Sequence, residues 1–202
     1  MVISHPQTDH MAGATRVLGN FRVDELWLPP THKAPRADES ALLAAAQHQG
    51  TTIRRMTAGE GVEVPGGRLE VWHPARDFPW RNPNDGSLVV ALDYHGRHWL
   101  FTGDIQKKAE RALLAAGSLP RVDWLMVPHH GSRSSSTPGL VTALQPGHAV
   151  VSAGRHNPWG LPRAEVLERW RGAGASIHRT DQEGSLYFVS DGGPVRRITP
   201  PE

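Results

Sequence analysis

The sequence predicts an α/β fold in which helices cover the outer faces of mixed β-sheets. Short apolar clusters alternate with helical patterns through most of the 202 residues, which is typical of α/β layering. Two tight turns, at residues 65–67 and 94–97, join neighbouring apolar segments as hairpins, so part of the sheet is antiparallel. A purely parallel, doubly wound sheet is therefore disfavoured. A chain of this length can bury one good core, and we expect a single domain over residues 1-202.

The predicted strands are short runs of apolar and β-branched residues that are bounded by turn-forming residues. In chain order they are Val2-Ile3, Glu25-Leu28, Thr52-Arg54, Val62-Val64, Arg68-Val71, Leu88-Leu92, His98-Phe101, Trp124-Val127, Ala149-Ser152, Ser176-His178, Ser185-Phe188 and Val195-Ile198.

The predicted helices lie between these strands. They are Ala12-Leu18, Ser40-Gln49, Lys107-Ala116, Pro138-Leu144 and Arg163-Ala173. The last helix follows Pro162 and precedes Gly174, which is the usual order of start and stop signals. Residues 75–86 form the longest turn-rich connection, and long ordered loops in compact domains are usually functional or disordered.

Composition restricts the chemistry that the chain can perform. Cysteine is absent, which excludes disulfides, thiolate nucleophiles, iron–sulfur clusters and cysteine-ligated zinc. The 12 histidines favour a metal or acid–base site, because histidine is the commonest metal ligand. The formal net charge is +2, so any contact with nucleic acid must be local. No apolar run reaches the roughly 20 residues of a membrane span, and the first residues lack the pattern of a signal peptide.

The first candidate site is at residues 4–10, Ser-His-Pro-Gln-Thr-Asp-His, directly after an apolar run and before a predicted helix. Loops between strands and helices are where α/β folds place their sites. His5, Asp9 and His10 put two imidazoles and a carboxylate within six residues, and a curved loop can turn them towards one point. The alternative is a polar turn with solvated histidines.

A second candidate is Asp104, which follows the apolar strand ending at Phe101 and precedes a predicted helix. A carboxylate at the end of a strand can bridge two cations through its two oxygens. Aspartate is also favoured at helix N-caps, and from this segment alone the cap is the simpler interpretation.

A third candidate is the pair His129 and His130, where a predicted strand runs into Gly131 and Ser132. Glycine lets the backbone approach a ligand closely and serine offers a donor, so the segment suits a metal together with an anionic oxygen. Adjacent exposed histidines also occur by chance. However, three separate strand ends deliver the same class of ligand, and independent chance events explain that poorly.

Together these motifs resemble the metallo-β-lactamase fold family, whose His-x-His-x-Asp-His motif is followed by a Gly-Asp carboxylate and a distal histidine. In the same order, residues 4–10, 101–104, 127–132, 152–160 and 179–185 more closely resemble the soluble C-terminal domain of ComEC-type DNA-uptake (competence) proteins. The resemblance covers nearly the whole chain. It implies an αββα sandwich with mixed sheets and a hydrolase site that binds two divalent metal ions.

Two features depart from the family pattern. Gln7 stands where the competence proteins usually have aspartate and the wider family has histidine, and a neutral amide is a weak ligand, so one metal site should be loosened. The family also has two or three strands ahead of the first motif, whereas this sequence starts at that motif. We therefore expect an incomplete N-terminal sheet with Val2-Ile3 at an exposed edge, in a fragment of a longer protein or in a separately encoded remnant.

The resemblance also implies a set of metal ligands. They are His5, Asp9, His10, Asp104, His129 and His130, and the implied catalytic residues are Asp9, His129 and His130. His5 would share one ion with a histidine of the 129–130 pair. Asp9 and His10 would hold the other ion, with Asp104 between the two.

In this reading, water held between the ions would ionise near neutral pH and attack phosphorus. Whichever of His129 and His130 is not a ligand would protonate the leaving oxygen, and the sequence leaves that choice open. Imidazoles favour zinc, whereas the carboxylates and Gln7 would also suit manganese, so zinc and manganese both stay candidates.

The substrate that the resemblance implies is DNA, with single strands favoured and with degradation of the strand that is not imported. Arg133 and Arg155 adjoin the motifs, and Ser132 could donate to phosphates, although its serine run is equally a flexible loop. Asn84 belongs to a turn that matches an Asn-rich turn of the competence proteins. Trp80 and Trp159 lie in loops beside polar motifs, where stacking on bases is possible but a core or rim position is commoner.

Two other functions stay open. One is a small-molecule hydrolase of the same fold that acts on an ester, a lactone or phosphocholine. The other is a non-catalytic binding module or inactive remnant. Within a longer membrane-embedded competence protein the domain would lie on the extracytoplasmic face, whereas alone and without a signal it would stay in the cytoplasm.

Overall fold

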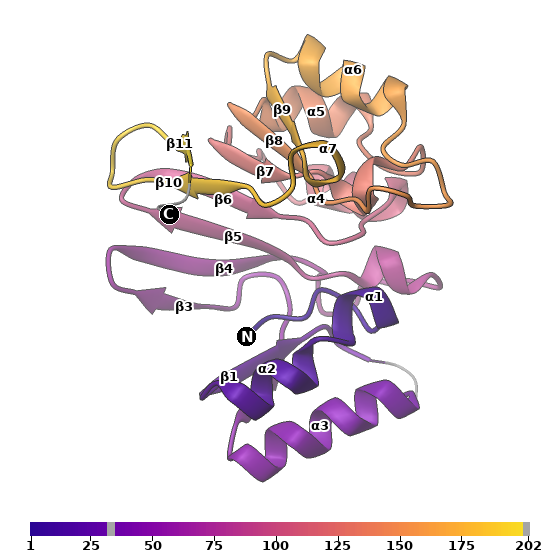
Figure 1. The fold of residues 1–202 in the computed structure, drawn as a ribbon, viewed down its shortest axis with the longest axis vertical. Coiled ribbons are helices and arrows are strands. Elements are labelled where there is room, and N and C mark those ends of the chain that lie inside the picture. Colours follow the sequence, from indigo (N-terminus) through magenta and orange to yellow (C-terminus); the bar gives the residue numbers. More distant parts are fainter. Residues whose placement is uncertain (32–34, 200–202) are drawn as a thin grey trace.

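The structure is a computed structural model that describes residues 1–31 and 35–199. Helices form its outer layers and β-sheets form its inner layers (Figure 1). This arrangement confirms the predicted α/β class with mixed sheets. The N-terminus lies between β3 and α2, and the C-terminal end of the described chain lies beside β10 (Figure 1).

The main sheet combines antiparallel and parallel pairing. Its strands are β3 (Gly61–Val64), β4 (Gly67–His73), β5 (Val89–Tyr94), β6 (Arg97–Phe101), β7 (Trp124–Met126), β8 (His148–Val151) and β9 (Ser176–Arg179). They lie side by side in chain order. The pairs from β3 to β6 are antiparallel and those from β6 to β9 are parallel. The hairpins predicted at residues 65–67 and 94–97 are confirmed as the β3–β4 and β5–β6 connections.

Helices α4 (Lys107–Ala115), α5 (Pro138–Leu144) and α6 (Ala164–Gly172) cover one face of the main sheet (Figure 1). Between this face and the helices lies the largest hydrophobic cluster, in which Leu125, Leu144 and Trp170 are fully buried. Burial of each such side chain contributes about 1.5–3 kcal/mol, so this cluster fixes the sheet against the helices. The helix predicted at Arg163-Ala173 is present, and Gly174 follows it in the left-handed conformation.

The opposite face of the main sheet is covered by two smaller units. A small parallel sheet contains β1 (Glu25–Leu28) and β2 (Thr52–Arg55), and an antiparallel hairpin contains β10 (Tyr187–Val189) and β11 (Arg196–Ile198). Trp27 and Met56 of the small sheet pack against Val71 and Val90 of the main sheet. The hairpin packs over Trp124 through a separate cluster.

Helices α2 (Ala14–Asn20) and α3 (Ala37–Gln49) form the outer layer beyond the small sheet, on the side remote from α5 and α6 (Figure 1). The predicted strand Val2-Ile3 is reduced to a single parallel bridge from Val2 to Trp27, with Ile3 N–H donating to the Trp27 carbonyl at 3.0 Å. Short helices are α1 (Thr8–Met11) and α7 (Thr180–Glu183), with 3-10 turns η1 (Pro83–Gly86) and η2 (Pro128–Gly131). Over residues 1–31 and 35–199, no helix is both long and apolar enough to span a membrane.

Candidate metal centre

The candidate ligands meet at one edge of the main sheet. Strands β6, β7 and β8 run parallel, so their carboxyl ends open onto the same edge. These ends lead to Asp104, to η2 with its two histidines, and to Ser152. The segment that follows the Val2 bridge brings residues 4–10 to the same place. All the metal ligands that the sequence predicted therefore lie around one edge, although they come from three separate stretches of the chain.

The first motif is partly helical rather than a loop, which corrects the sequence prediction. Gln7 is extended, and its carbonyl accepts hydrogen bonds from the N–H groups of His10 and Met11, both at 3.0 Å. Asp9 and His10 therefore lie on the single turn α1. Met11 is 2% exposed and packs in the cluster beneath α2 and α3, which anchors this turn.

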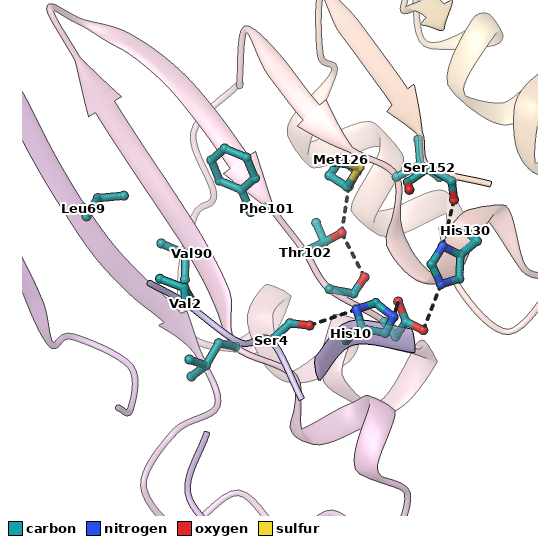
Figure 2. A pocket seen from close by; sticks show the side chains of 14 residues that line it. Val2, Ser4, His10, Leu69, Val90, Phe101, Thr102, Met126, His130 and Ser152 are labelled. Carbon is teal, nitrogen blue, oxygen red and sulfur yellow. Dashed lines mark hydrogen bonds and ion pairs between the residues drawn. The ribbon is translucent and has the colours of Figure 1, made fainter. Parts of the chain in front are cut away.

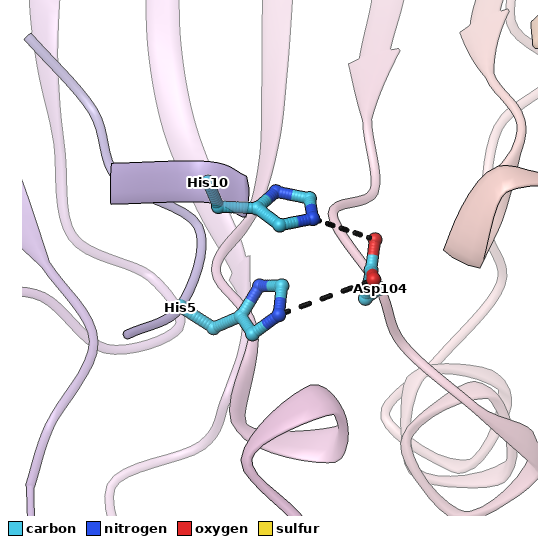
Figure 3. A group of neighbouring side chains, drawn as sticks. All are labelled: His5, His10 and Asp104. Atoms are coloured by element: carbon cyan, nitrogen blue, oxygen red, sulfur yellow. Dashed lines mark ion pairs between the residues drawn. The ribbon is translucent and has the colours of Figure 1, made fainter. Parts of the chain in front are cut away.

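Asp104 lies at the centre of the ligand group (Figure 3). Its carboxylate is 3% exposed, with His10 Nε2 at 3.4 Å from Oδ1, and with His130 Nε2 at 3.5 Å and His5 Nε2 at 4.0 Å from Oδ2. Burial opposes ionisation of this carboxyl group. The neighbouring imidazoles of His10 and His130 outweigh burial and hold the pKa of Asp104 well below its ordinary value. At neutral pH the group is therefore an anion with two available oxygens.

His5 and His10 present free nitrogen atoms to this carboxylate. Their Nδ1 atoms lie 3.1 and 3.3 Å from the hydroxyl of Ser4, which can accept a hydrogen from each. Both Nε2 atoms are buried and have no hydrogen-bond partner within the described part of the chain. Burial is the main cause that lowers the pKa of His5 to about 4, so this ring is neutral at pH 7.

Buried polar atoms without partners are rare in folded proteins and each costs on the order of 1–3 kcal/mol. Cations held by these Nε2 lone pairs and the Asp104 carboxylate would satisfy all of them. The donor set of neutral imidazoles and carboxylates is the one that zinc and related ions prefer. The residues present therefore fit a divalent metal.

The loop that carries His129 and His130 has an unusual backbone. Both residues have a left-handed backbone conformation, with φ of 51° and 54°, and φ of Gly131 is also positive, at 78°. A Cβ on Gly131 would lie 2.6 Å from Pro162 Cβ, so this position requires glycine on two grounds. Ser135 Oγ donates to the Pro128 carbonyl at 2.9 Å and ties the loop together.

Glu110 of α4 stabilises the segment that follows His129 and His130. Glu110 is fully buried, and its carboxylate accepts hydrogen bonds from the N–H groups of Ser136 and Thr137. Burial raises the pKa of Glu110, and these hydrogen bonds oppose that rise.

His130 and His129 differ in what their ring nitrogens contact. His130 Nδ1 lies 2.8 Å from the Ser152 carbonyl, to which it donates, so Nε2 carries the lone pair that faces Asp104. The adjacent Asp104 carboxylate, which would accept a hydrogen bond from the protonated ring, is the main cause that raises the pKa of His130. Figure 2 shows the contact between Ser152 and His130. An imidazole fixed in this way by a carbonyl is the usual arrangement of a metal ligand.

In His129, by contrast, both ring nitrogens are engaged by other side chains. Nδ1 lies 2.9 Å from Ser134 Oγ and 3.3 Å from Gln106 Nε2, and Nε2 lies 3.2 Å from Asn84 Nδ2. Burial is the main cause that lowers the pKa of His129. The sequence-based grouping paired one of the two loop histidines with His5. The distances instead group His130 with Asp9 and His10.

The buried turn η1 stands behind the ligand group. Gln7 Nε2 donates to Asn84 Oδ1 at 2.6 Å, so Asn84 links Gln7 to His129. Next to it, Asp85 Oδ1 accepts from the N–H groups of Gln106 and Ala109, at 3.1 and 3.2 Å, at the start of α4. The N-cap alternative for Asp104 is therefore wrong: the N-cap residue is Gln106 and the capping carboxylate is that of Asp85.

A wide cleft of about 1360 Å³ opens beside the ligand group. Its wall includes Ser132 and Arg133 of the predicted substrate residues, and also Trp159. Arg133 also pairs with Glu165 at 2.8 Å. Arg155 is exposed in the loop after β8 and is not among the residues that line the cleft.

The two tryptophans that sequence analysis singled out have different places. Trp159 is 69% exposed at the cleft wall, whereas Trp80 packs against the main core and stacks on Phe78. A smaller cavity of about 430 Å³ adjoins the cleft at Asp104 and His130. Apolar side chains such as Val90 and Phe101 line it (Figure 2).

Sequence reasoning missed the contacts of Gln106, Ser134 and Ser152 with the two histidines. The position of Ser152 at the end of a predicted strand was the available signal, because β6, β7 and β8 share one edge. No pattern in the sequence indicated that the side chain of Gln106 would contact His129.

Comparison with known proteins gives consistent results. Residues 1–156 match the family model described as the metallo-beta-lactamase superfamily. The chain is 29% identical over 188 residues to ComE operon protein 3 of Bacillus subtilis (strain 168). The aligned region covers 93% of this chain and 24% of that protein. It is 28% identical over 187 residues to Recombination protein 2 of Haemophilus influenzae, and that aligned region covers 92% of this chain and 21% of that protein. The chain thus spans about a quarter or less of these curated relatives.

Among solved structures, CmlA, a diiron beta-hydroxylase from Streptomyces venezuelae, matches 98% of this chain and 44% of its own chain. The TM-score is 0.58 at 14% identity, so the likeness concerns the fold alone.

Proposed function

The chain belongs to the metallo-beta-lactamase superfamily, and from this membership we propose that it is a metal-dependent hydrolase that cleaves phosphodiester bonds of DNA. The observation that carries the proposal is the buried Asp104 carboxylate, towards which His5 and His10 turn Nε2 atoms without hydrogen-bond partners in the described chain. This donor group borders a cleft that is open to a large substrate.

The proposed ligands are His5, Asp9, His10, Asp104 and His130. Two divalent ions, zinc or manganese, would supply an activated water at neutral pH and offset the charge that develops on a phosphate. Asp104 would contribute to both positions, because its carboxylate oxygens face His10, His130 and His5. Asp9, exposed on α1, contributes its carboxylate from the cleft side.

His129 has a separate role in this proposal. Its ring is fixed from both sides by Asn84 and Ser134, and its Nε2 lies 3.9 Å from Asp104 Oδ2. It therefore stands beside the reacting centre without serving as a ligand, and its protonated ring would deliver a proton to the leaving oxygen. Ser132 and Arg133 at the cleft wall would bind the phosphates on either side.

The size and chemistry of the cleft support DNA as the substrate. A volume of about 1360 Å³ exceeds the roughly 300–1,000 Å³ that is usual for small-molecule sites. Its wall offers the cations Arg133 and Arg163 for phosphates and the exposed ring of Trp159 for a base. A strand with unpaired bases can use such a ring, so single-stranded DNA fits best. The competence relatives suggest action during DNA uptake, as one domain of a longer membrane-embedded protein on the extracytoplasmic side.

The decisive experiment is a comparison of substrates with the purified chain loaded with zinc or manganese. Bis(p-nitrophenyl) phosphate and single-stranded oligonucleotides should be hydrolysed, and duplex DNA more slowly. Turnover of a chromogenic ester, a lactone or a phosphocholine ester without phosphodiester cleavage would favour a small-molecule hydrolase instead. No turnover of any substrate by metal-loaded protein would favour a binding module.

A further inference from the structure

The donor atoms do not divide evenly between two ions. Those within 4.8 Å of one another form two groups, His5 with His10 and Asp104, and Asp9 with His10 and His130. The groups share His10, whose Nε2 has a single lone pair and can bind only one ion. The placement of His10 therefore decides which position is complete.

Distances place His10 with Asp9 and His130. Donors on a tetrahedral ion with bonds of about 2.1 Å lie roughly 3.4 Å apart. His10 Nε2 lies 3.4 Å from Asp104 Oδ1 and 3.6 Å from Asp9 Oδ2. His130 Nε2 lies 3.5 Å from Asp104 Oδ2 and 3.9 Å from Asp9 Oδ2. Asp9 Oδ2, His10 Nε2 and His130 Nε2 thus lie together, and each imidazole has one oxygen of Asp104 near the spacing that a tetrahedral ion requires.

The position at His5 is left with fewer donors. His5 Nε2 lies 4.0 Å from Asp104 Oδ2, and Asp104 is shared with the first position. The amides of Gln7 and Asn84 lie on this side, and the 2.6 Å hydrogen bond between them occupies Asn84 Oδ1. An amide oxygen is in any case a weaker ligand than a carboxylate or an imidazole. Both nitrogens of His129 are hydrogen-bonded, so this ring does not fill the gap.

We infer that the two ion positions of this chain are unequal. The position at Asp9, His10, His130 and Asp104 binds its ion without help, and the position at His5 and Asp104 binds its ion firmly only when a phosphate oxygen completes the coordination. The second half of this inference rests on the proposed phosphodiesterase function. The first half rests on the donor geometry alone.

The inequality assigns different tasks to the two positions. Four protein donors leave little room for a further ligand, as in structural zinc sites, whereas a catalytic ion keeps open places for water and substrate. The His5 position has such open places. Ions bound by few carboxylates commonly acquire substrate phosphates as ligands. Gln7 then acts as a positioning residue, because its bond to Asn84 fixes His129 and keeps the His5 position incomplete.

The test measures metal binding and does not require turnover. Mn²⁺ is titrated into metal-free protein by calorimetry, with and without inorganic phosphate, and the metal retained after dialysis is counted. The wild type should retain one ion per chain. Loss of an outer hydrogen-bond partner alone weakens a metal site about 10–100-fold, so an absent ligand should separate the two affinities by at least about 100-fold. Phosphate should increase the affinity for the second Mn²⁺ ion at least about tenfold, as expected for a completed ligand set.

Gln7→Asp and Gln7→His should both bring retention to two ions per chain, and melting temperatures of the metal-free variants check that each is folded. Asn82→Asp is the matched control, because it places a carboxylate on the exposed residue before η1, outside the donor group. It should still retain one ion. Two ions of equal affinity in the wild type without phosphate, or a Gln7→Asp variant that behaves like Asn82→Asp, would overturn the inequality.

A second step that phosphate does not strengthen would overturn the substrate half of the inference and leave the unequal donor sets standing. If unequal binding is found but bis(p-nitrophenyl) phosphate is not hydrolysed, the proposed function fails and the first half of the inference holds.

Discussion

Asp85 Oδ1 accepts a hydrogen bond from the backbone N–H of Ala109 at 3.2 Å, across the first turn of α4. This bond gives the capping role to a carboxylate that lies 19 positions before Asp104 in the sequence. Asp104 itself faces the histidines and forms no cap. The two carboxylates therefore allow structural and metal-binding roles to be separated by mutation.

We expect Asp104→Ala to abolish activity and most metal binding, because removal of the bridging anion leaves two cations facing each other. Asp85→Ala should keep its metal and lose about 1 kcal/mol of stability through the lost cap. Bound metal and the free energy of unfolding, measured on the same preparations, distinguish the two. Full metal content in Asp104→Ala would remove this carboxylate from the centre.

Replacement of the adjacent histidines should give two different phenotypes. His130→Ala should lose metal, because its Nε2 faces Asp104 while Nδ1 is fixed by the Ser152 carbonyl. His129→Ala should keep metal and lower kcat on DNA by about 10²–10⁴-fold, the usual contribution of a general acid. The loss should be much smaller with bis(p-nitrophenyl) phosphate, because p-nitrophenolate leaves without a proton. Equal losses on both substrates would argue against proton delivery by His129.

Trp159→Ala should weaken binding of a single-stranded oligonucleotide by about 1–3 kcal/mol, the cost of one lost stacking contact. Trp159→Phe should recover part of this loss because it retains an aromatic face. Phe21→Ala is the control, since Phe21 is 67% exposed at the end of α2, away from the cleft. Fluorescence anisotropy of a labelled oligonucleotide with catalytically inactive protein measures the affinity. Similar effects of Trp159→Ala and Phe21→Ala would exclude a specific stacking site.

The stability of the metal-free protein should fall in mild acid, in part through His73. Burial lowers the pKa of this residue below its ordinary value of 6.5, and a hydrogen bond to the Asp85 carbonyl opposes the shift. Below pH 6.5 the unfolded chain therefore binds a proton that the folded chain does not. The contribution of His73 is fully present above pH 6.5 and decreases as the pH falls towards the folded pKa.

His73→Gln should accordingly reduce the slope of unfolding free energy against pH between pH 5 and 7, as measured by urea denaturation. The exposed residue His48 provides the control variant His48→Gln, whose slope should equal that of the wild type. An unchanged slope in His73→Gln would show that His73 does not contribute to acid sensitivity.

Local patterns in the sequence were sufficient to predict most of the fold. The hairpin turns at residues 65–67 and 94–97 identified the antiparallel half of the main sheet, and glycine and proline marked the ends of α6. Short helices were missed. α1 and α7 are single turns without apolar periodicity, and α1 depends on a carbonyl contact of Gln7 that no pattern reveals.

The predicted resemblance to the metallo-β-lactamase family and to ComEC-type competence proteins is confirmed by the family match and the relatives. What the sequence could not provide was the pairing of distant polar groups. Gln7 and Asn84 are 77 positions apart, and their hydrogen bond became visible only when the chain was folded. The choice between His129 and His130 likewise depended on partners from other segments, such as Ser152.

The adjacent left-handed histidines on η2 also have a consequence for engineering. Each non-glycine residue in that conformation carries a cost of roughly 1–2 kcal/mol, so glycine at position 129 or 130 would favour the observed backbone. The same change would delete an imidazole from the metal centre. Directed evolution for heat resistance should therefore enrich mutations in this loop that inactivate the protein, unless each round also screens for retained metal. Stabilising substitutions that keep the chemistry intact are better sought on the exposed face of α3.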